Sequence, residues 1–405
     1  MTNATRASLL AFSLLAFSAQ EGWAKTNYKN HLIGGRAALL GGAFTAVSDD
    51  STAIFYNPAG MAYVPGSNVS GSGNLYSINS QSYEGVIGRE DWQRKSENLT
   101  PSYFGMSRKS KRWTLGLGFA QLDKVKENQN QVFENVDAGA GLMNYYSLVM
   151  STEDNHYLFA MSAAYETSST FSLGLTLSYS LRHYLRHQDQ YTRYADTDTE
   201  HAFDYKEIKS KGLKPTLGFL WSPREKWSLG LTASKDLIFT QITEDVRNRL
   251  DKGSSTPAFV RQTSQGKDQT PLELALGTAF FPSPSLLYSV NLEYFLESAS
   301  GRNDVINLSL GSEYFFSPQY ALRAGLFTNR SNVAEYNRVA RNLDQRVHIY
   351  GLSAGLGYFT PTTELTGGVI ASRGRGEIQP YSGSVAVRSF TYFDLKFLLA
   401  SSYNF

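Results

Sequence analysis

The sequence predicts an all-β protein, an antiparallel transmembrane β-barrel of about 14 strands. Three observations favour this fold. Apolar and polar residues alternate with period two along most of the chain after residue 66. The segments are joined alternately by short turns and by long polar stretches, and the last strand ends on an aromatic residue, Phe405. Because a bilayer core holds no water to satisfy backbone polar groups, such strands cross it as a closed barrel.

The C-terminal strand shows the alternation clearly. Successive side chains of a strand point to opposite faces, so one face of this strand is an apolar wall and the other is mostly polar. We expect the barrel assembly machinery to recognise the strand that ends at Phe405. The apolar face, broken only by Ser401, carries Phe393, Leu395, Phe397, Leu399, Tyr403 and Phe405, and the opposite face includes Asp394, Lys396, Ser402 and Asn404.

Internal strands follow the same rule, most clearly at 171–182 and 113–120. Residues 141–166 must form one strand to keep an even count with both chain ends periplasmic, although Thr152 to Asn155 resembles a turn. Pro215 has no backbone N–H to donate to a neighbouring strand, so we expect an irregularity of the sheet there, at the rim of the barrel. Short turns are predicted at 108–112, 166–170, 222–226, 281–285, 316–319 and 359–362, and long polar loops at 79–100, 122–140, 184–211, 239–270, 329–345 and 372–387.

The composition narrows the class of protein. The chain of 405 residues has no cysteine, which excludes disulfides, a thiol nucleophile and a lipid-modified cysteine. Its net charge of +2 gives no argument for nucleic acid as a partner. It is rich in aromatic residues and glycine, with 25 Tyr, 24 Phe and 34 Gly, yet has no apolar run near the roughly 20 residues of a membrane helix.

The first residues resemble an export signal, with Arg6 ahead of an apolar stretch and small residues around Ala24. We therefore expect residues 1–24 to be a signal peptide, residues 25–66 an N-terminal segment, and residues 67–405 the barrel. Residues 34–65 do not alternate. Instead they mix small residues, two acids and a helix-breaking Asn57-Pro58. A linker in the periplasm is the alternative to a plug inside the barrel.

Four elements in order mark this stretch: Gly35-Arg36-Ala37, Gly41-Gly42-Ala43, Ala46 followed by Asp49-Asp50, and Asn57-Pro58-Ala59-Gly60. The stretch resembles the mature N-terminus of the FadL/TodX family of outer membrane transporters for hydrophobic compounds. The resemblance implies a hatch of short helices inside a barrel of 14 strands. It assigns hatch or gating roles to Gly35, Arg36, Gly42, Asp49, Asp50, Asn57, Pro58, Ala59 and Gly60.

Elementary chemistry supports a compact hatch. Asp49, Asp50 or Ser51 can cap a short helix from Ala53 to Tyr56 that ends before Pro58. The resemblance also implies a lateral opening in the third strand, where Gly116 and Gly118 lie. We expect Phe44, Phe55 and Tyr56, near the hatch, to line a substrate pocket.

Alternation predicts that several charged side chains face the lumen, because a charge facing lipid costs a few kcal/mol. Glu313 and Arg323 should face each other across one hairpin, and Asp394 and Lys396 can neutralise each other. A structural role is the simplest reading of these charges. The functional alternative is that Arg323 or Lys396 meets a substrate carboxylate. Arg182, Glu273 and Glu293 are also predicted to point inward.

We find no catalytic constellation, and no metal site or cofactor is predicted. His183 and His187 share a strand face but lie at a loop base. The predicted function is facilitated diffusion of a hydrophobic small molecule, a long-chain fatty acid or an aromatic hydrocarbon, by a monomer in the Gram-negative outer membrane. Its other contacts would be membrane lipid and lipopolysaccharide. The alternatives are a PorV-like scaffold working with a secretion system, and a general porin.

Overall fold

A computed structural model describes residues 25–87, 90–137, 142–196, 198–299, 301–335, 345–378 and 387–405. The predicted signal peptide, residues 1–24, lies outside the described residues. None of the helices in the described part of the chain is long and apolar enough to cross a membrane.

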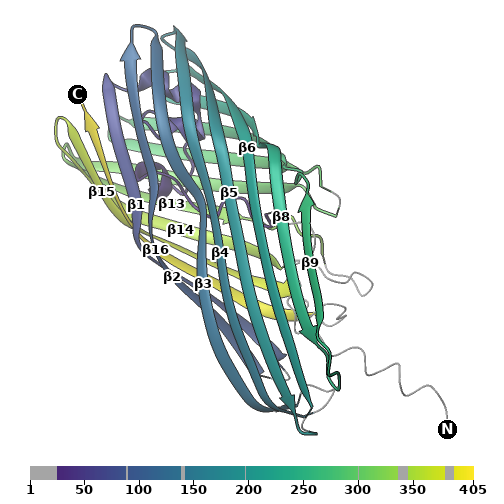
Figure 1. The fold of residues 1–405 in the computed structure, drawn as a ribbon. Helices are drawn as coiled ribbons and strands as arrows, with labels where there is room; N and C mark the ends of the chain where they lie inside the picture. Colours follow the sequence, from purple (N-terminus) through teal and green to yellow (C-terminus); the bar gives the residue numbers. More distant parts are fainter. Residues whose placement is uncertain are drawn as a thin grey trace.

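Antiparallel strands form the wall, and the first strand pairs with the last (Figure 1). The fold class predicted from the sequence, a closed barrel of 14 strands, is therefore confirmed for the described residues. The strands are β1 (Ser67–Ile87), β2 (Glu90–Ser110), β3 (Trp113–Asp137), β4 (Leu142–Ser168), β5 (Phe171–Tyr194), β6 (Thr199–Arg224), β7 (Trp227–Lys235), β8 (Leu237–Leu250), β9 (Ala258–Gln265), β10 (Leu272–Ser283), β11 (Leu286–Leu296), β12 (Val305–Ser317), β13 (Tyr320–Asn329), β14 (Arg346–Phe359), β15 (Thr363–Ile378) and β16 (Arg388–Asn404).

Strands β7 and β8 together make one wall strand, interrupted at Asp236. Strand β6 pairs with β7 as far as Thr216–Ser234 and resumes pairing on β8 at Leu213–Leu237. Pro215 lies between these two pairs, and its missing N–H accounts for the interruption. The irregularity predicted at Pro215 is thus present, but inside a long strand rather than at a rim. Strands β9 and β10 likewise make one wall strand, since β9 pairs with β8 and β10 pairs with β7, so the sixteen strands labelled in the described chain make 14 in the wall.

Several stretches predicted as long loops are strand instead. Residues 79–100, 122–140 and 184–211 belong mostly to β1–β6, which continue as tall hairpins, and 239–270 holds most of β8 and all of β9. That prediction was wrong because polar residues beyond the membrane still pair their backbones without an apolar face. The single strand predicted for 141–166 is confirmed as β4, with Thr152 to Asn155 paired on both sides.

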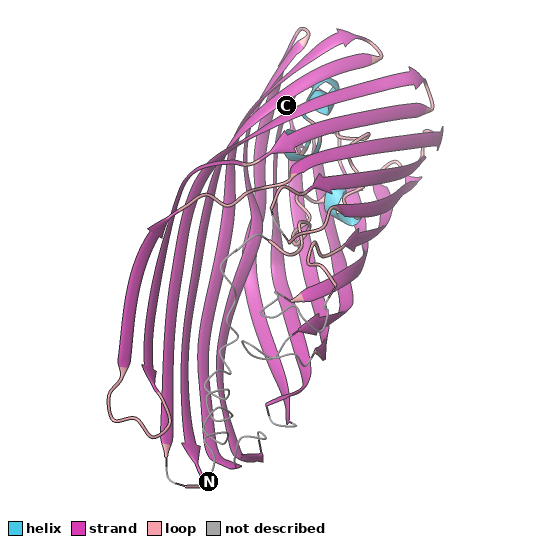
Figure 2. Ribbon diagram, turned by 90° about the vertical axis from the view of Figure 1, so that its right-hand side faces the viewer, coloured by secondary structure: helices cyan, strands magenta, loops and turns pink. Residues whose placement is uncertain are grey.

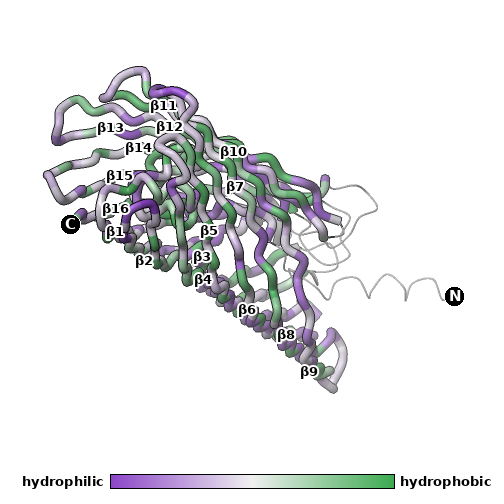
Figure 3. Tube along the Cα trace, turned by 90° about the horizontal axis from the view of Figure 1, so that it is seen from above, coloured by the Kyte–Doolittle hydropathy of each residue, from purple (hydrophilic) through white to green (hydrophobic). Residues whose placement is uncertain are grey.

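The wall strands present an apolar outer face. Along them the chain trace changes repeatedly between hydrophobic and hydrophilic (Figure 3). On β5, Leu173, Leu175 and Leu177 are exposed, whereas Ser172, Thr176 and Ser178 are buried toward the lumen. The large exposed apolar side chains of β10–β16 likewise fall at alternate positions, which is the pattern of a barrel surrounded by lipid.

Residues 25–66, the N-terminal segment, lie inside the barrel near the end that carries the short turns and the C-terminus (Figure 2). Three short helices form here: α1 (Arg36–Leu39), α2 (Ala53–Tyr56) and the 3-10 helix η2 (Pro58–Tyr63). The helix predicted from Ala53 to Tyr56 is confirmed. Small side chains and glycines let the segment pack closely against the wall.

Wall glycines make that close approach possible. A Cβ added at Gly174 of β5 would lie 2.2 Å from the carbonyl carbon of Pro58, and one at Gly230 of β7 would lie 2.1 Å from the oxygen of Thr45. Backbone therefore meets backbone, and no larger residue fits at these positions without a shift.

Candidate functional site

The first described residues, 25–33, which we call the strap, run through the lumen without forming a helix or a strand. The amide of Asn27 donates to the oxygens of Asn329 and Val347 at 2.9 and 3.0 Å. On the β3 side of the barrel, the side-chain amide of Asn30 donates to the Asp123 carboxylate at 2.9 Å. Lys396 Nζ donates to the backbone oxygen of Asn30 at 2.9 Å. The strap is therefore tied to opposite parts of the wall.

A buried ion network fixes the start of α1. Arg36 Nε lies 3.0 Å from both carboxylate oxygens of Glu313, and Arg36 also pairs with Asp49. Glu313 in turn accepts from Arg323 Nε at 2.6 Å, as the predicted cross-strand pair requires. Arg323 is fully buried and also reaches Glu364 at 2.7 Å. These charges neutralise one another and hold the N-terminal segment to β12 and β13.

Asn57 links two parts of the segment to the wall. Its side-chain oxygen accepts from Ala59 N at 3.1 Å, which caps η2. Its amide donates to Thr45 O at 2.8 Å and to Phe219 O at 3.0 Å. A single side chain thus satisfies one N–H and two carbonyl groups, which explains why asparagine suits this position.

One cavity of about 230 Å³ lies between the strap, α2 and the wall strands β3–β8, β10 and β11. We call it the central cavity. Its apolar lining includes Ile33, Phe55, Tyr56, Leu122 and Phe295, and its polar lining includes Lys25, Lys29, His31, His156, Ser180, Arg182, Lys214, Asp236, Asp268, Glu273 and Glu293. An amphipathic lining of this kind can hold a small ligand with an apolar body.

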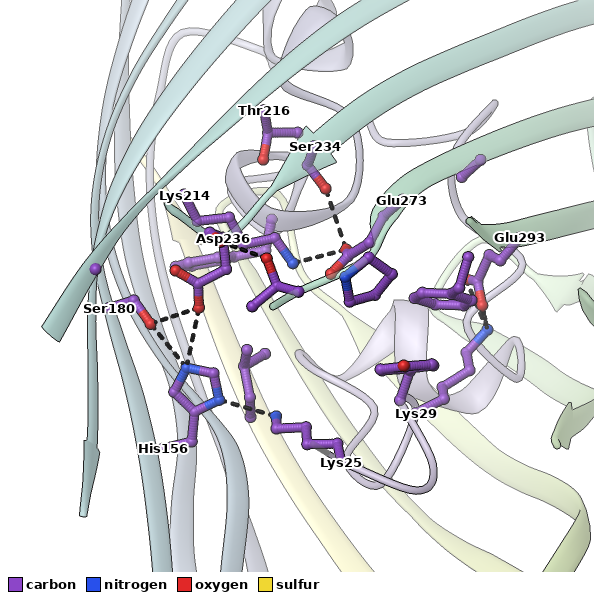
Figure 4. Close-up of a pocket in the computed structure, with 18 of the residues that line it drawn as sticks. Lys25, Lys29, His156, Ser180, Lys214, Thr216, Ser234, Asp236, Glu273 and Glu293 are labelled. Atoms are coloured by element: carbon purple, nitrogen blue, oxygen red, sulfur yellow. Dashed lines mark hydrogen bonds and ion pairs between the residues drawn. The ribbon is translucent and has the colours of Figure 1, made fainter. Parts of the chain in front are cut away.

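Four cations of the lining are paired with acids, whereas Lys211, which also lines the cavity, has an exposed side chain. Lys29 pairs with Glu293 at 2.9 Å, and Lys214 pairs with Glu273 at 2.7 Å (Figure 4). Arg182 pairs with Asp154 at 2.8 Å, and Lys25 pairs with Asp123. The inward positions predicted for Arg182, Glu273 and Glu293 are confirmed, since all three line the central cavity.

A hydrogen-bonded chain runs through one side of the cavity (Figure 4). Lys25 Nζ lies 2.8 Å from His156 Nδ1, His156 Nε2 lies 2.9 Å from Ser180 Oγ, and Ser180 donates to Asp236 at 2.8 Å. An ammonium can only donate, so His156 Nδ1 accepts and Nε2 carries the proton. His156 therefore cannot take a proton from Ser180, and the chain is not an activated nucleophile.

The wall changes its pairing beside this cavity. Strands β2 and β3 pair from Ser110–Trp113 up to Tyr103–Ala120, and the ladder ends there. Pro101, which has no N–H to donate, lies two residues beyond the last pair. A register shift between Gln121 and Asp123 leaves Leu122 as an extra residue of β3. We call this discontinuity the β2–β3 seam.

Side chains bridge the seam farther along the strands. Lys124 Nζ donates to Leu99 O at 3.0 Å, Gln129 to Lys95 O at 2.9 Å, and Gln131 to Gln93 O at 3.0 Å. Such bonds can break and re-form one by one, whereas a backbone ladder opens cooperatively. Leu122, at the base of the seam, lines the central cavity.

The structure places the predicted pocket residues unevenly. Phe55 and Tyr56 line the central cavity, whereas Phe44 is fully buried and packs edge-to-face on Tyr56 behind the lining. Arg323 and Lys396 do not line it. Arg323 is held in the buried ion network, and Lys396 pairs with Asp394 at 2.9 Å, as predicted. This geometry gives no support to a contact between a substrate carboxylate and either cation.

Gly116 and Gly118 lie below the seam, in the paired part of β3. A Cβ at Gly116 would meet Met61 and Ile54, and one at Gly118 would meet Phe55. Both glycines thus accommodate the N-terminal segment. The ladder ends two residues beyond Gly118, so any opening in this strand would begin at Leu122.

Sequence reasoning missed His31, Leu122, His156 and Asp236 as lining residues. Pro101 and Pro215 offered a signal, since each marks a break in a ladder beside the central cavity. His31 and His156 offered none, because the segments that carry them to the cavity, the strap and β4, are far apart in sequence.

No known family profile matches the sequence, and no curated protein resembles it closely enough to be a sequence relative. Solved structures do resemble it. A Pseudomonas aeruginosa FadL homologue matches with a TM-score of 0.69 and 14% identity, over 94% of this chain and 100% of its own. This chain has the FadL/TodX fold. The Pseudomonas putida toluene transporter TodX matches with a TM-score of 0.68 and 12% identity, over 94% of this chain and 100% of that one.

The FadL/TodX fold recurs in the Ralstonia pickettii toluene transporter TbuX, with a TM-score of 0.62 and 12% identity, over 92% of this chain and 98% of that one. At such low identity the likeness establishes the fold. It leaves the substrate and the role of each residue to be argued from this chain.

Proposed function

We propose that the protein is an outer membrane channel through which a hydrophobic small molecule diffuses inward. The central cavity carries this proposal: its lining combines apolar and polar side chains, the N-terminal segment forms part of it, and it lies inside a barrel whose outer face suits lipid. The structural neighbours described as toluene transporters support the same substrate class. An apolar solute crosses a charged outer leaflet poorly, and a channel with an apolar pocket relieves that barrier.

In this proposal the N-terminal segment is a hatch, and the molecule leaves sideways through the β2–β3 seam. The support for a lateral exit is the end of the ladder at Tyr103–Ala120 together with the contact of Leu122 with the central cavity. The support for a hatch is the dense packing of α2 and η2 against the wall, and in this proposal the packed segment closes the bore toward the short turns. A lateral exit would deliver an apolar solute to the membrane interior rather than to water.

The proposal is tested by uptake of labelled toluene into cells that lack other channels of this fold. Cells producing the protein should take up toluene faster than cells with an empty vector. A Leu122→Trp variant, which fills the base of the seam, should lose most of that gain, while Leu115→Trp on the outer face of the same strand should keep it.

Equal uptake with and without the protein would contradict the proposal, and co-purification of a secretion partner would then favour the scaffold alternative. Sugar permeation through proteoliposomes at porin rates would favour a general porin. Normal toluene uptake by a folded Leu122→Trp variant would contradict the proposed lateral exit but not the proposed channel.

A further inference from the structure

The outer face of β13, β14 and β15 changes character toward the end that lies opposite the short turns. One outward row across these strands is apolar, because Leu326 lies opposite Leu352 and Leu352 lies opposite Ala371. In the next outward row, Tyr350 lies opposite Arg373. The change from aliphatic to aromatic and charged side chains marks the edge of the surface that suits lipid tails.

Two tyrosines of β14 frame that apolar surface. Tyr350 is 59% exposed and Tyr358 is 40% exposed, and the exposed Leu352 and Leu356 lie between them. The tyrosines are roughly 26 Å apart along the strand, or about 20 Å in height at a tilt of about 40°. An apolar band between aromatic girdles is about 25 Å tall. Tyr350 therefore lies where lipid tails give way to headgroups.

Three exposed arginines lie at this boundary or just beyond it. Arg373 is directly opposite Tyr350, and Arg375, next on the same face of β15, is opposite His348. Arg330 follows β13 on the other side of β14, and the N–H of the residue after it donates to His348 Nδ1 at 3.2 Å. Neighbouring strands are about 5 Å apart, so these three long side chains can reach one headgroup. We call Arg330, Arg373 and Arg375 the arginine cluster.

The arginine cluster has no ion pair with any residue that the structure describes. Two acids of the same region, Glu335 and Glu377, both pair with Arg346, at 3.1 and 3.7 Å. Like charges on adjacent strands repel each other when no anion lies between them. The cluster is therefore an unmatched positive charge at the level of lipid headgroups.

Other sectors of the wall are charged differently toward the same end. Beside β11 and β12 an acid is present, and Tyr294 donates to Asp304. On β6, Lys209 pairs with Glu207 at 2.7 Å. The arginine cluster differs from these sectors in having no acid that neutralises it.

Phosphate is the anion that suits the arginine cluster best. A guanidinium is a planar fork of N–H donors that matches two phosphate oxygens. In the proposed orientation the end opposite the short turns faces outward, so the cluster meets the outer leaflet. Lipopolysaccharide in that leaflet carries phosphates on its sugar headgroup, and its acyl chains can lie on Leu326 and Leu352 directly below the cluster.

From these observations we infer that β13–β15 carry a binding site for one phosphorylated glycolipid of the outer leaflet. The arginine cluster binds its phosphates, and Tyr350 lies beside its sugar. The inference goes beyond the proposed function, from which it takes only the location in the outer membrane. Such a site fixes the depth of this side of the barrel in the membrane.

Lipid A, the phosphorylated anchor of lipopolysaccharide, is the probe that tests the inference. The purified full-length protein in detergent is titrated with lipid A carrying both phosphates, with the same lipid A after its phosphates are removed, and with phosphatidylglycerol. Native mass spectrometry follows the binding. We expect phosphorylated lipid A to bind at least about tenfold more tightly than either of the other lipids, because only this lipid engages the arginine forks at more than one phosphate.

Variants assign the effect to the arginine cluster. The triple variant Arg330→Gln, Arg373→Gln, Arg375→Gln should weaken phosphorylated lipid A about a hundredfold, roughly fivefold for each arginine. Replacing the same three residues with lysine keeps the charge but not the fork, so this variant should bind with intermediate affinity. Both variants should take up toluene at the wild-type rate.

The matched control changes three other exposed arginines in the same way: Arg108→Gln, Arg112→Gln, Arg224→Gln. These residues lie at or beside short turns, at the opposite end of the barrel. The control variant should bind phosphorylated lipid A as the wild type does. Folding of each variant is checked by heat-dependent electrophoretic mobility.

The outcomes separate this inference from the proposed channel. Equal binding of lipid A with and without its phosphates, or equal weakening in the glutamine variant and the control, would overturn the inference. Phosphatidylglycerol binding as tightly as phosphorylated lipid A would also overturn it, because the cluster would then recognise any anionic lipid. Normal lipid A binding by a protein that gives no uptake of toluene would contradict the channel and keep the site.

Discussion

Arg36 of the N-terminal segment and Glu313 of β12 form a two-oxygen ion pair inside the barrel, with Arg36 Nε 3.0 Å from each carboxylate oxygen. Glu313 is 1% exposed and also holds Arg323, so one carboxylate bridges two guanidinium groups, whose other acidic partners are Asp49 and Glu364. The pair joins a residue of the N-terminal segment to a residue of the wall. It therefore couples the position of the N-terminal segment to the stability of the barrel.

Glu313→Gln should destabilise the protein by about 3–5 kcal/mol, because removing one partner of a buried ion network leaves the other charges uncompensated. The measurement is thermal unfolding followed by electrophoretic mobility. Glu244→Gln is the control, since Glu244 pairs with the exposed Arg261 and such pairs contribute at most about 1 kcal/mol. An equal loss of stability in the two variants would show that the buried ion network stabilises the protein no more than an exposed ion pair does.

Gly230→Ala should displace the N-terminal segment without unfolding the barrel. The new Cβ would lie 2.1 Å from the Thr45 oxygen, which is backbone and must move. We expect increased ion conductance of single proteins in planar bilayers. Gly367→Ala is the matched control, because the nearest heavy atom to its Cβ would be 4.0 Å away. A Gly230→Ala protein with the same ion conductance as the wild type would mean that this contact does not hold the N-terminal segment in place.

Asn57→Ala should loosen η2, because it removes the cap on Ala59 and leaves the oxygens of Thr45 and Phe219 without their donor. Each buried group left unpaired costs about 1–3 kcal/mol. Limited proteolysis should cut the N-terminal segment faster in this variant. Asn57→Asp keeps the acceptor but not the donor and should show an intermediate rate; wild-type rates in both would refute the role of Asn57.

The N-terminal segment should be held more firmly in mild acid. Burial raises the pKa of Asp50 to about 6, from its ordinary value of 3.8. A carboxyl with a raised pKa contributes most when protonated, so its contribution is full below about pH 4 and is lost as the pH rises through 6. Hydrogen exchange of residues 50–56 should therefore speed up between pH 4 and 7 after correction for intrinsic rates. Asp50→Asn should flatten this pH dependence of exchange. The same pH dependence in Asp50→Asn as in the wild type would refute the role of Asp50.

The sequence predicted those parts of the fold that lipid constrains. Lipid requires an apolar side chain at every second position, so β5, β16 and the pair Glu313–Arg323 follow from alternation. Above the membrane that constraint ends, and the tall hairpins of β1–β6 therefore looked like loops.

The candidate site was harder to predict for a related reason. The central cavity lies where neighbouring strands stop pairing, and the β2–β3 ladder stops at Tyr103–Ala120. The alternation within each strand does not reveal where its pairing with the next strand ends. Phe55 and Tyr56 could be predicted because they belong to the motif-bearing segment. Leu122 could not, since its importance comes from being an extra residue in a ladder.

The most direct test of the proposal that the N-terminal segment is a hatch, and must move for uptake, is to fasten this segment to the wall. The hydroxyls of Ser51 and Ser70 are in hydrogen-bond contact between the N-terminal segment and β1, and the chain has no cysteine of its own. A Ser51→Cys, Ser70→Cys protein should take up toluene slowly when oxidised and at the wild-type rate after a reductant opens the disulfide. Uptake at the wild-type rate with the disulfide shown to be closed would contradict the account.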